Sequence, residues 1–547
     1  MVERGTAGTP ATGPPQPRSS AHATGDDGGD PSARQGRAGS WLAAAVGIAL
    51  VLIGAGLLVL SASLDDPPQA ALAGGNLPIN AGAGDPLDQS GHNSPVVTRN
   101  PTDPANIVVG NRLDSPDFAC ALHVSTDGGA TFEETRLPEA DPQGKCYAPQ
   151  PAFAADGTLH VAFVTLRGTG NRPHRVWLAS SDDGGQTLSE PSRLLGELAF
   201  QVGLTADPDD ADRLYLTWLE AEETATLAFP DTGYPLRLMS SDDGGVSWTE
   251  PVTVSDPDRA RVVAPTLAVG AAGVLHLLYL DLGDDRLDWA GGHEGRGGPP
   301  YPGTWELVAA RSGDEGRTWS ETTVDAFNPP TRILVFLPDV PSLAVDRERG
   351  RVYAAFHARH HDDADVFVWR STDNGETWSS PVRVNDTDPA DGTAQYLPAL
   401  DVAPSGRVDV VYYDRRDGAD ENVMNAVSLA FSHDAGATFT DRLVLSDRPF
   451  DSRVGFGGFR GMADLGSRLG LLSTPDRALA VWSDTRAGTE VSEKQDLVRQ
   501  FATFARSISS PVPPSVLRGV AGVSVLLGLV GVGGRLGGKL GRQMPPR

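Results

Sequence analysis

The sequence predicts an all-β fold in which a unit of about 60 residues repeats around a closed ring. Three observations favour this fold: a turn pattern that occurs six times, β-rich runs that precede the turns, and a strand-like segment near the start of the chain that can close the ring. Each unit then holds four short antiparallel strands, and seven units make a seven-bladed β-propeller. A six-bladed ring is the alternative.

The repeated turn reads S-x-D-x-G-x-[S/T]-aromatic, with Leu188 as the one exception at the last position. The Asp carboxylate can accept backbone N–H bonds, and the Gly can take a positive φ. The pattern therefore predicts a hairpin between the third and the outer strand of each unit. Its aspartates, spaced by 56, 60, 71, 59 and 61 residues, are expected to be structural: Asp127, Asp183, Asp243, Asp314, Asp373 and Asp434.

Runs that end in an aromatic residue mark the second strand of five units: TLHVAF, RLYLTW, VLHLLY, RVYAAF and RVDVVY. The first unit contains NIVVGN and CALHVS, and the seventh contains RALAVW and DLVRQFATF. This seventh unit has neither the aspartate turn nor an outer strand. The segment Asn76–Asn80, NLPIN, is similar to the outer strands of other units, so we expect it to pair with the third strand of unit seven and remove the exposed sheet edges.

The N-terminal region predicts a membrane anchor. Residues 1–40 are rich in Gly, Pro, Ser and Thr and are expected to be a disordered cytoplasmic tail. An uncharged run from Trp41 to Leu60 is long enough to cross a bilayer, and we assign the anchor to residues 41–62. Because Arg34 and Arg37 precede it, the chain that follows is expected outside the cytoplasm. A cleaved signal peptide is the alternative.

The C-terminal region predicts a second span at residues 515–534, with a loose amphipathic tail as its alternative. Residues 535–547 would be a basic cytoplasmic tail, and residues 63–74 and 507–514 would be linkers to a propeller at 75–506. In an oxidising space outside the cytoplasm, the only two cysteines, Cys120 and Cys146, are expected to form a disulfide worth about 3 kcal/mol.

Composition excludes several classes of protein. The net charge of −26 repels nucleic acid, and two cysteines are too few for a Cys-based zinc site. No phosphate loop, GxSxG or HExxH motif occurs, so no cofactor is expected, and nothing in the sequence assigns a Ca²⁺ site. The segment 357–363, with three His and two Asp, is interpreted as a solvated acidic loop rather than a metal site.

Six such turns at this spacing resemble the Asp-box (BNR) repeats of the sialidase-like β-propeller superfamily, across residues 75–505. The resemblance implies a propeller whose Asp boxes lie on the face away from the ligand. Two features depart from sialidases proper, which have six blades and an Arg-Ile-Pro signature near their start. Here seven units are counted, and the nearest string is Thr331-Arg-Ile-Leu334.

Functional residues are expected on the opposite rim, where second strands end and inner strands begin. A sialidase grips a substrate carboxylate with arginines and uses an acid and a Tyr nucleophile activated by Glu. By position the carboxylate would be held by Arg416, Arg486 and either Arg167 or Arg460, with Asp484 beside them. Asp339 or Asp414 would be the acid and Tyr396 the nucleophile. The D-x-R pairs in YYDRRDG and WSDTRAG have a second interpretation, as ion pairs that brace the rim.

The sequence therefore favours a membrane-anchored, extracytoplasmic propeller that binds a glycan or an extracellular protein on the face opposite its aspartate turns. The alternative is an exo-α-sialidase-type glycoside hydrolase that uses the arginine cluster, the Asp acid and the Tyr with its Glu partner.

Overall fold

The computed structural model describes residues 45–58, 70–83, 85, 87–168, 171–221, 234–259, 261–285, 301–329, 339–360, 363–389, 391–418, 423–455, 465–504, 520–527 and 529. The chain divides into two compact units. The smaller unit contains Met1–Pro67 with Ser507–Arg547, and the larger contains Pro68–Arg506.

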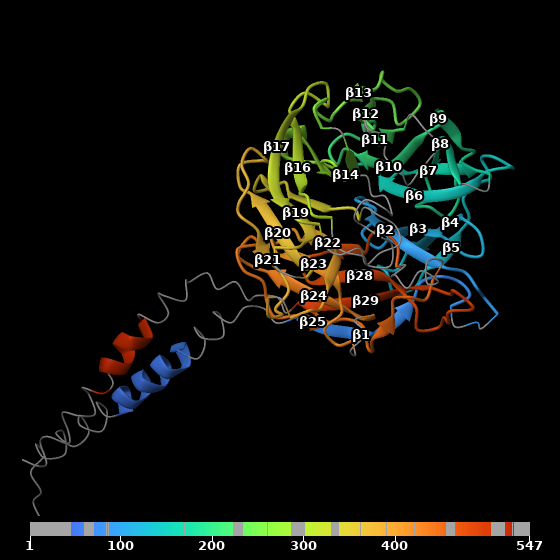
Figure 1. Ribbon diagram of the computed structural model, residues 1–547. Coiled ribbons are helices and arrows are strands. Elements are labelled where there is room, and N and C mark those ends of the chain that lie inside the picture. The colour runs from blue at the N-terminus through green and yellow to red at the C-terminus, as the bar shows by residue number, and fades with distance from the viewer. Residues whose placement is uncertain are drawn as a thin grey trace, which may run out of the picture. The chain divides into compact units, whose positions relative to one another are not determined.

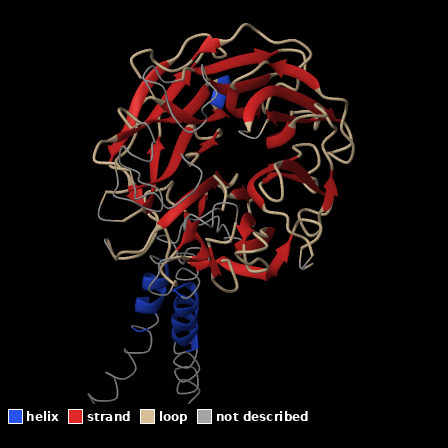
Figure 2. Cartoon of the chain, turned by 45° about the vertical axis from the view of Figure 1, so that its right-hand side comes forward, coloured by secondary structure: helices blue, strands red, loops and turns tan. Residues whose placement is uncertain are grey.

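The larger unit is a ring of seven antiparallel sheets, which Figures 1 and 2 show as a seven-bladed β-propeller. Blade 1 consists of β2 (His92–Arg99), β3 (Ile107–Leu113), β4 (Ala119–Ser125) and β5 (Glu133–Thr135). Blade 2 consists of β6 (Lys145–Phe153), β7 (Leu159–Arg167), β8 (Arg172–Ser181) and β9 (Ser192–Leu195). Blade 3 consists of β10 (Ala199–Ala206), β11 (Leu214–Glu220), β12 (Leu236–Ser241) and β13 (Val252–Thr253). Blade 4 consists of β14 (Val262–Val269), β15 (Leu275–Asp281), β16 (Trp305–Ser312) and β17 (Ser320–Phe327), and the 3₁₀ turn η1 (Ala271–Gly273) follows β14.

Blades 5 to 7 complete the ring and confirm seven blades rather than six. Blade 5 consists of β18 (Ser342–Asp346), β19 (Arg351–Ala358), β20 (Asp365–Ser371) and β21 (Val382–Arg383). Blade 6 consists of β22 (Gln395–Val402), β23 (Val408–Asp414), β24 (Met424–Ser432) and β25 (Leu443–Val444), and the short β26 (Phe450–Asp451) also pairs with β24. Blade 7 is β27 (Gly470–Ser473), β28 (Arg477–Asp484), β29 (Asp496–Phe504) and β1 (Ala70–Pro78).

The core lies between the blades. Each second strand packs against a neighbouring blade on both of its faces, so β7 and β15 are buried along almost their whole length. This explains why the second strands read as continuous apolar runs instead of alternating ones. Large aromatic side chains fill the layer between blades 4 and 5, where Tyr279, Trp305 and Trp369 belong to one buried cluster.

Strand β1 closes the ring, as the segment Asn76–Asn80 predicted. It pairs antiparallel with β29, with Ala70 opposite Phe504 and Pro78 opposite Val498. The strand begins at Ala70, so it includes five residues that the sequence assigned to the linker 63–74. Because Ala70 and Phe504 are partners, both ends of the propeller chain leave it side by side at the outer edge of blade 7.

The six aspartate turns share one geometry and join the third to the outer strand in blades 1 to 6. In the turn of blade 3, the Ser241 hydroxyl donates to Asp243 at 2.8 Å, and Ser247 donates its N–H and its hydroxyl to the same carboxylate at 2.8 and 2.6 Å. These hydrogen bonds lower the pKa of Asp243 to about 2. Gly245 has a φ of +88°, as the pattern predicted. All six turns lie on one face, which we call the turn face.

In the smaller unit, the described residues form helices at 45–58 and 520–527. The two helices touch at Gly54, where an added Cβ would lie 2.6 Å from Val525 and 2.8 Å from the Ala521 carbonyl oxygen. Within the described part of the chain, neither helix has the length and hydropathy that crossing a membrane requires. The predicted spans 41–62 and 515–534 both extend beyond these described segments.

Candidate functional site

The face opposite the turn face is where second strands end and inner strands begin, and we call it the open face. Five inner strands carry a β-bulge there, each with one non-glycine residue at positive φ: Ser94, Ala148, Gln201, Ala264 and Leu397. Proline follows four of the five. Bulges re-aim side chains and gather near functional sites, so this ring of bulges sets the level at which a site can form.

Of the arginines predicted to hold a carboxylate, the three that the structure describes are each paired with an acid of the protein. Arg167 donates two hydrogen bonds to Asp141 at 2.8 and 2.9 Å. Arg486 binds Asp484 at 2.7 Å and also contacts Asp447. The structure therefore does not bring these arginines together at one point.

Arg416 and Asp414 form a pair of the same kind. Arg416 contacts Asp414 at 2.8 Å and also reaches Asp386. The fully buried Asp414 carboxylate further accepts hydrogen bonds from Gln395 at 3.2 Å and from Arg442 at 3.2 Å. Its acceptor positions are thus taken by side chains of the protein.

These ion pairs lie at the seams between blades. Asp141, Asp386 and Asp447 follow the outer strands of blades 1, 5 and 6, and each pairs with an arginine at the end of the next blade's second strand. The seam between blades 3 and 4 has the opposite polarity, because Arg259 follows β13 and contacts Asp281 at 2.9 Å. This arrangement matches the bracing interpretation of the D-x-R pairs.

Asp339 and Tyr396, which the sequence placed at the start of inner strands, do lie near each other. The Asp339 carboxylate contacts His357 Nε2 at 3.1 Å. The ring of Tyr396 packs edge-on to His357, with centroids 6.4 Å apart, and the Arg415 guanidinium lies 5.0 Å above the Tyr396 ring. We call these four residues the Asp339 cluster.

Burial determines the chemistry of Tyr396. Its side chain is 0% exposed, and its hydroxyl donates to Asn425 Oδ1 at 2.7 Å. Burial raises the pKa of the phenol, and the negative charge of Asp339 adds to the rise against the opposing effect of Arg415. The phenol therefore stays neutral at ordinary pH and acts as a hydrogen-bond donor. The oxygen of an amide, not of a carboxylate, accepts this hydrogen bond.

Two arginines that the sequence did not single out as a pair lie together on the open face. Arg112, at the end of β3, contacts Asp114 at 2.8 Å and donates to the Tyr147 hydroxyl at 2.8 Å. Arg468, just before β27, donates to Gln150 Oε1 at 3.2 Å, and within the described residues it contacts no carboxylate. Its Nε is buried without a hydrogen-bond partner. Burial, with repulsion from Arg112, lowers the pKa of Arg468 to about 10.

A cleft of about 780 Å³ lies on the open face over blade 1. Its walls include Ala81, Gly82, Asp88 and Ser90, residues 117–121, residues 136–141 and 144–146, and Phe163 and Thr165 of β7. Phe118, Leu137 and Pro138 supply apolar surface, and the Cys120–Cys146 disulfide, predicted from the sequence, joins blade 1 to blade 2 beside it. The volume is in the range of small-molecule sites. We call it the blade 1 cleft.

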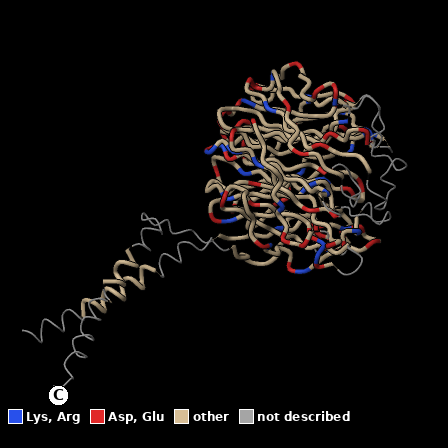
Figure 3. Tube along the Cα trace, turned by 60° about the vertical axis from the view of Figure 1, so that its left-hand side comes forward, with Lys and Arg blue, Asp and Glu red and all other residues tan. Residues whose placement is uncertain are grey.

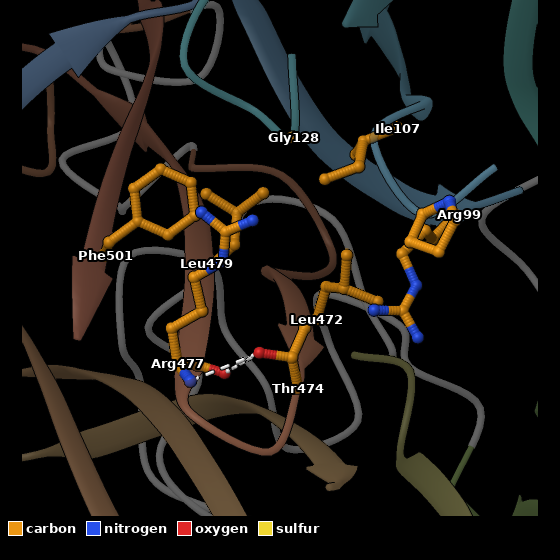
Figure 4. A pocket seen from close by; sticks show the side chains of 9 residues that line it. Arg99, Ile107, Gly128, Leu472, Thr474, Arg477, Leu479 and Phe501 are labelled. Atoms are coloured by element: carbon orange, nitrogen blue, oxygen red, sulfur yellow. Dashed lines mark hydrogen bonds between the residues drawn. The ribbon is translucent and has the colours of Figure 1, made fainter. Parts of the chain in front are cut away.

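A second cavity, on the turn face between blades 7 and 1, is too small to be a binding site. It measures about 10 Å³, enough for about one water molecule. Figure 4 shows Arg477 and Phe501 in its wall, and the guanidinium of Arg477 lies 4.9 Å from the centre of the Phe501 ring. Arg477 lies in the one blade that lacks an aspartate turn, and it packs against Gly128 of the neighbouring turn.

Several predicted positions fall outside the described residues or have other contacts. Arg460, together with His361 and Asp362 of the histidine-rich segment, lies outside the described residues. His360 contacts Asp325 at 3.2 Å. Within the part of the chain that the structure describes, no group of three His, Cys, Asp or Glu is placed to hold a metal ion. Acidic and basic residues are mixed around the propeller in Figure 3.

No family model matches the chain, and no curated protein matches it. Similar solved structures include a protein of unknown function from Dyadobacter fermentans (15% identity, 80% of this chain and 99% of that chain, TM-score 0.43) and a Hadza microbial sialidase (15% identity, 73% and 74%, TM-score 0.41). An α-L-arabinanase from Penicillium chrysogenum also matches (14% identity, 66% and 95%, TM-score 0.39). At scores this low the likenesses carry no argument about activity, and the propeller assignment rests on the sheet order of this chain.

Proposed function

We propose that this protein is a membrane-anchored, extracytoplasmic propeller that binds an acidic glycan on its open face. The proposal rests on the pairing of Arg468. Its guanidinium has five N–H donors, and within the described residues it donates to one acceptor, Gln150 Oε1. A buried donor without a partner costs free energy unless a ligand satisfies it. A planar carboxylate or a sulfate ester supplies the acceptors that this guanidinium lacks.

The neighbourhood of Arg468 supports an anion rather than a neutral ligand. Arg112 forms an ion pair with Asp114, but its positive charge still repels that of Arg468 and lowers the pKa of Arg468. An anion at this point relieves that repulsion. The paired arginines Arg167, Arg416 and Arg486 offer no such gain, because their own carboxylates already occupy them.

Anchoring outside the cytoplasm is supported by three features. The uncharged run at 41–60 follows two arginines, which favour a cytoplasmic N-terminus. Both chain ends leave the propeller together, at the Ala70–Phe504 pair. The Cys120–Cys146 disulfide is of the kind that persists in oxidising compartments. An extracellular protein, the other ligand class that the sequence leaves open, would present a side-chain carboxylate to the same arginine.

A second candidate function is the exo-α-sialidase-type hydrolase, and the Asp339 cluster favours it. Asp339 is buried and near Tyr396, as an acid and a nucleophile of this mechanism must be. Against it, the Tyr396 hydroxyl donates to Asn425, whereas the mechanism needs a carboxylate base at that position. Binding without turnover is therefore the first candidate.

The proposed function is tested by calorimetric titration of the full-length protein in detergent. The probes are the methyl glycosides of N-acetylneuraminic acid and glucuronic acid, with methyl glucoside as the neutral control. We expect an acidic probe to bind and Arg468→Gln to remove that binding, whereas the neutral probe gives no signal. Binding of the neutral probe with equal affinity would contradict the proposal.

The hydrolase candidate needs its own assay, with a fluorogenic sialoside and the variant Asp339→Asn. Turnover above buffer that is lost in Asp339→Asn would make the protein an enzyme. Turnover equal to buffer would exclude the sialidase reaction and leave the binding function standing.

A further inference from the structure

Two aromatic side chains connect Arg468 to the blade 1 cleft. Phe118 forms part of the wall of the cleft, and its ring packs edge-on against Tyr147, with centroids 5.5 Å apart. The Tyr147 hydroxyl accepts a hydrogen bond from Arg112, the guanidinium beside Arg468. Sugar rings present apolar C–H faces that pack on aromatic side chains. The two aromatic rings therefore make a continuous path from the anion position to the cleft.

The cleft itself differs from Arg468 in charge. Three of its carboxylates are already paired with cations: Asp117 with Lys145, Asp88 with Lys494, and Asp141 with Arg167. Of the remaining charged residues in its walls, Glu134 and Glu139 are exposed and outnumber Arg136. A second anion in the cleft would meet net negative charge, whereas the hydroxyls of a neutral sugar would find carboxylate acceptors.

The volume of the cleft is larger than one acidic sugar at Arg468 can explain. About 780 Å³ is the volume of a site for a drug-sized ligand, and it lies beside the arginine position rather than over it. We infer that the ligand is an oligosaccharide that places one acidic sugar at Arg468 and continues, over Phe118 and Tyr147, with neutral sugars into the blade 1 cleft. This inference rests on the proposed function, because it extends the ligand that Arg468 would bind along the same open face.

Two expectations about ligands follow from this arrangement. A neutral extension of two hexoses should tighten binding of the acidic sugar about tenfold, because covering roughly 60 Å² of apolar surface gives a factor of about ten. A chain in which every sugar is acidic should gain nothing from its extra length, because Glu134 and Glu139 oppose the added charges.

The experiment is calorimetric titration of the full-length protein with three probes: methyl glucuronide, a trisaccharide with one glucuronic acid followed by two neutral hexoses, and a triuronate. We expect the mixed trisaccharide to bind about tenfold tighter than the methyl glucuronide, and the triuronate to bind no tighter than the methyl glucuronide. Equal affinities for the methyl glucuronide and the mixed trisaccharide would overturn the inference while leaving the proposed function intact. No binding of any probe, in wild type and Arg468→Gln alike, would overturn both.

Variants of the cleft separate its role from folding. Phe118→Leu keeps apolar packing against Tyr147 and should remove most of the gain for the trisaccharide without weakening the methyl glucuronide. Glu139→Lys changes an exposed side chain and should make the triuronate bind tighter than wild type. Val246→Ala, at an exposed position on the turn face, is the matched control and should change nothing. If Phe118→Leu weakens both probes equally at unchanged melting temperature, or if Glu139→Lys leaves the triuronate affinity unchanged, the cleft is not part of the site.

Discussion

The turn face and the open face of this propeller are built on opposite principles. On the turn face, six turns repeat one set of hydrogen bonds, and each Asp carboxylate is satisfied by its own turn. On the open face, the blades differ from one another in their charged residues, and within the described residues the guanidinium of Arg468 contacts no carboxylate and leaves its Nε without a hydrogen-bond partner. Repetition of one turn therefore indicates the fold, whereas the proposed function rests on a position of the open face whose hydrogen-bond donors are incompletely paired.

The arginines of the open face sharpen the same comparison. Arg416 and Arg468 both lie at the open rim, yet Arg416 has two carboxylates and Arg468 has an amide. Pairing makes Arg416 a brace between blades 5 and 6. Because Arg468 contacts no carboxylate within the described residues, its guanidinium can still donate hydrogen bonds to an anionic ligand, as the proposed function requires.

The largest expected effect is on ligand affinity. Arg468→Gln should weaken binding of the acidic sugar about 100-fold, because a charge-assisted hydrogen bond contributes about 1.5–3 kcal/mol and this guanidinium can donate two. Its melting temperature should not fall, since the change removes repulsion with Arg112. Arg416→Gln is the matched control and should lower the melting temperature with unchanged affinity. The opposite assignment of the two effects would break the comparison.

The next effect concerns the disulfide beside the cleft. Replacing both Cys120 and Cys146 by Ser should lower the free energy of unfolding by about 3 kcal/mol, because the bond closes a loop of 26 residues in the unfolded chain. Chemical denaturation of the two proteins measures this difference. Reductant should lower the stability of wild type to that of the double variant and leave the double variant unchanged. Equal stability of the oxidised wild type and the variant would contradict the cross-link.

A smaller effect tests the rigidity of the turn face. Gly245→Ala should cost about 2 kcal/mol, because Gly245 has a φ of +88° and an added Cβ would lie 2.6 Å from Leu178 Cδ2. Gly196→Ala is the control, since nothing lies within 4 Å of its added Cβ, and it should change stability by less than about 0.5 kcal/mol. Similar losses from both variants would show that the turn geometry is not what matters.

The smallest effect is a pH dependence. Burial raises the pKa of Asp401 to about 7 from its ordinary value of 3.8, so the native state holds a proton that the unfolded state releases. Stability from this group therefore falls as pH rises from about 4 to about 7. Asp401→Asn should reduce that fall only modestly, because the side chain of Asp401 is partly rather than fully buried. The turn aspartates act in the other direction. The pKa of Asp243 is about 2, for example, so its contribution to stability is lost as pH falls below about 4. Melting curves across this range measure both, and a constant difference between wild type and variant would contradict the assignment.

The fold could be predicted from the sequence because its signals are local. The aspartate turns, the apolar second strands, the closing segment and the disulfide each depend on neighbouring residues or on a count of cysteines. The inner strands of blades 1 and 7, β2 and β27, were not located, because His92–Arg99 contains Ser and Pro at its bulge and Gly470–Ser473 is only four residues long. The start of β1 at Ala70 was also missed, since its first residues, AALAGG, have no strand-like alternation.

The site could be predicted only in part, because it depends on distances across the ring. Asp339 precedes β18 as predicted, whereas Tyr396 lies inside β22, and only the coordinates reveal that Asn425 accepts the hydrogen bond of the tyrosine. Arg167, Arg416 and Arg486 were selected for their positions on the rim, and each contacts an acid from a neighbouring blade. Arg468 stands in no recognisable motif. The one signal that could have identified Arg468 is the absence of an acidic residue two positions before it, where the D-x-R pairs have Asp.

The proposed function requires that the ligand be recognised on the open face, at the guanidinium of Arg468. A structure of the full-length protein bound to the mixed acidic trisaccharide tests it most directly. We expect the sugar carboxylate within hydrogen-bonding distance of Arg468 and the neutral sugars over Phe118. A ligand seated among the aspartate turns, or at the paired arginines Arg416 and Arg486, would contradict it.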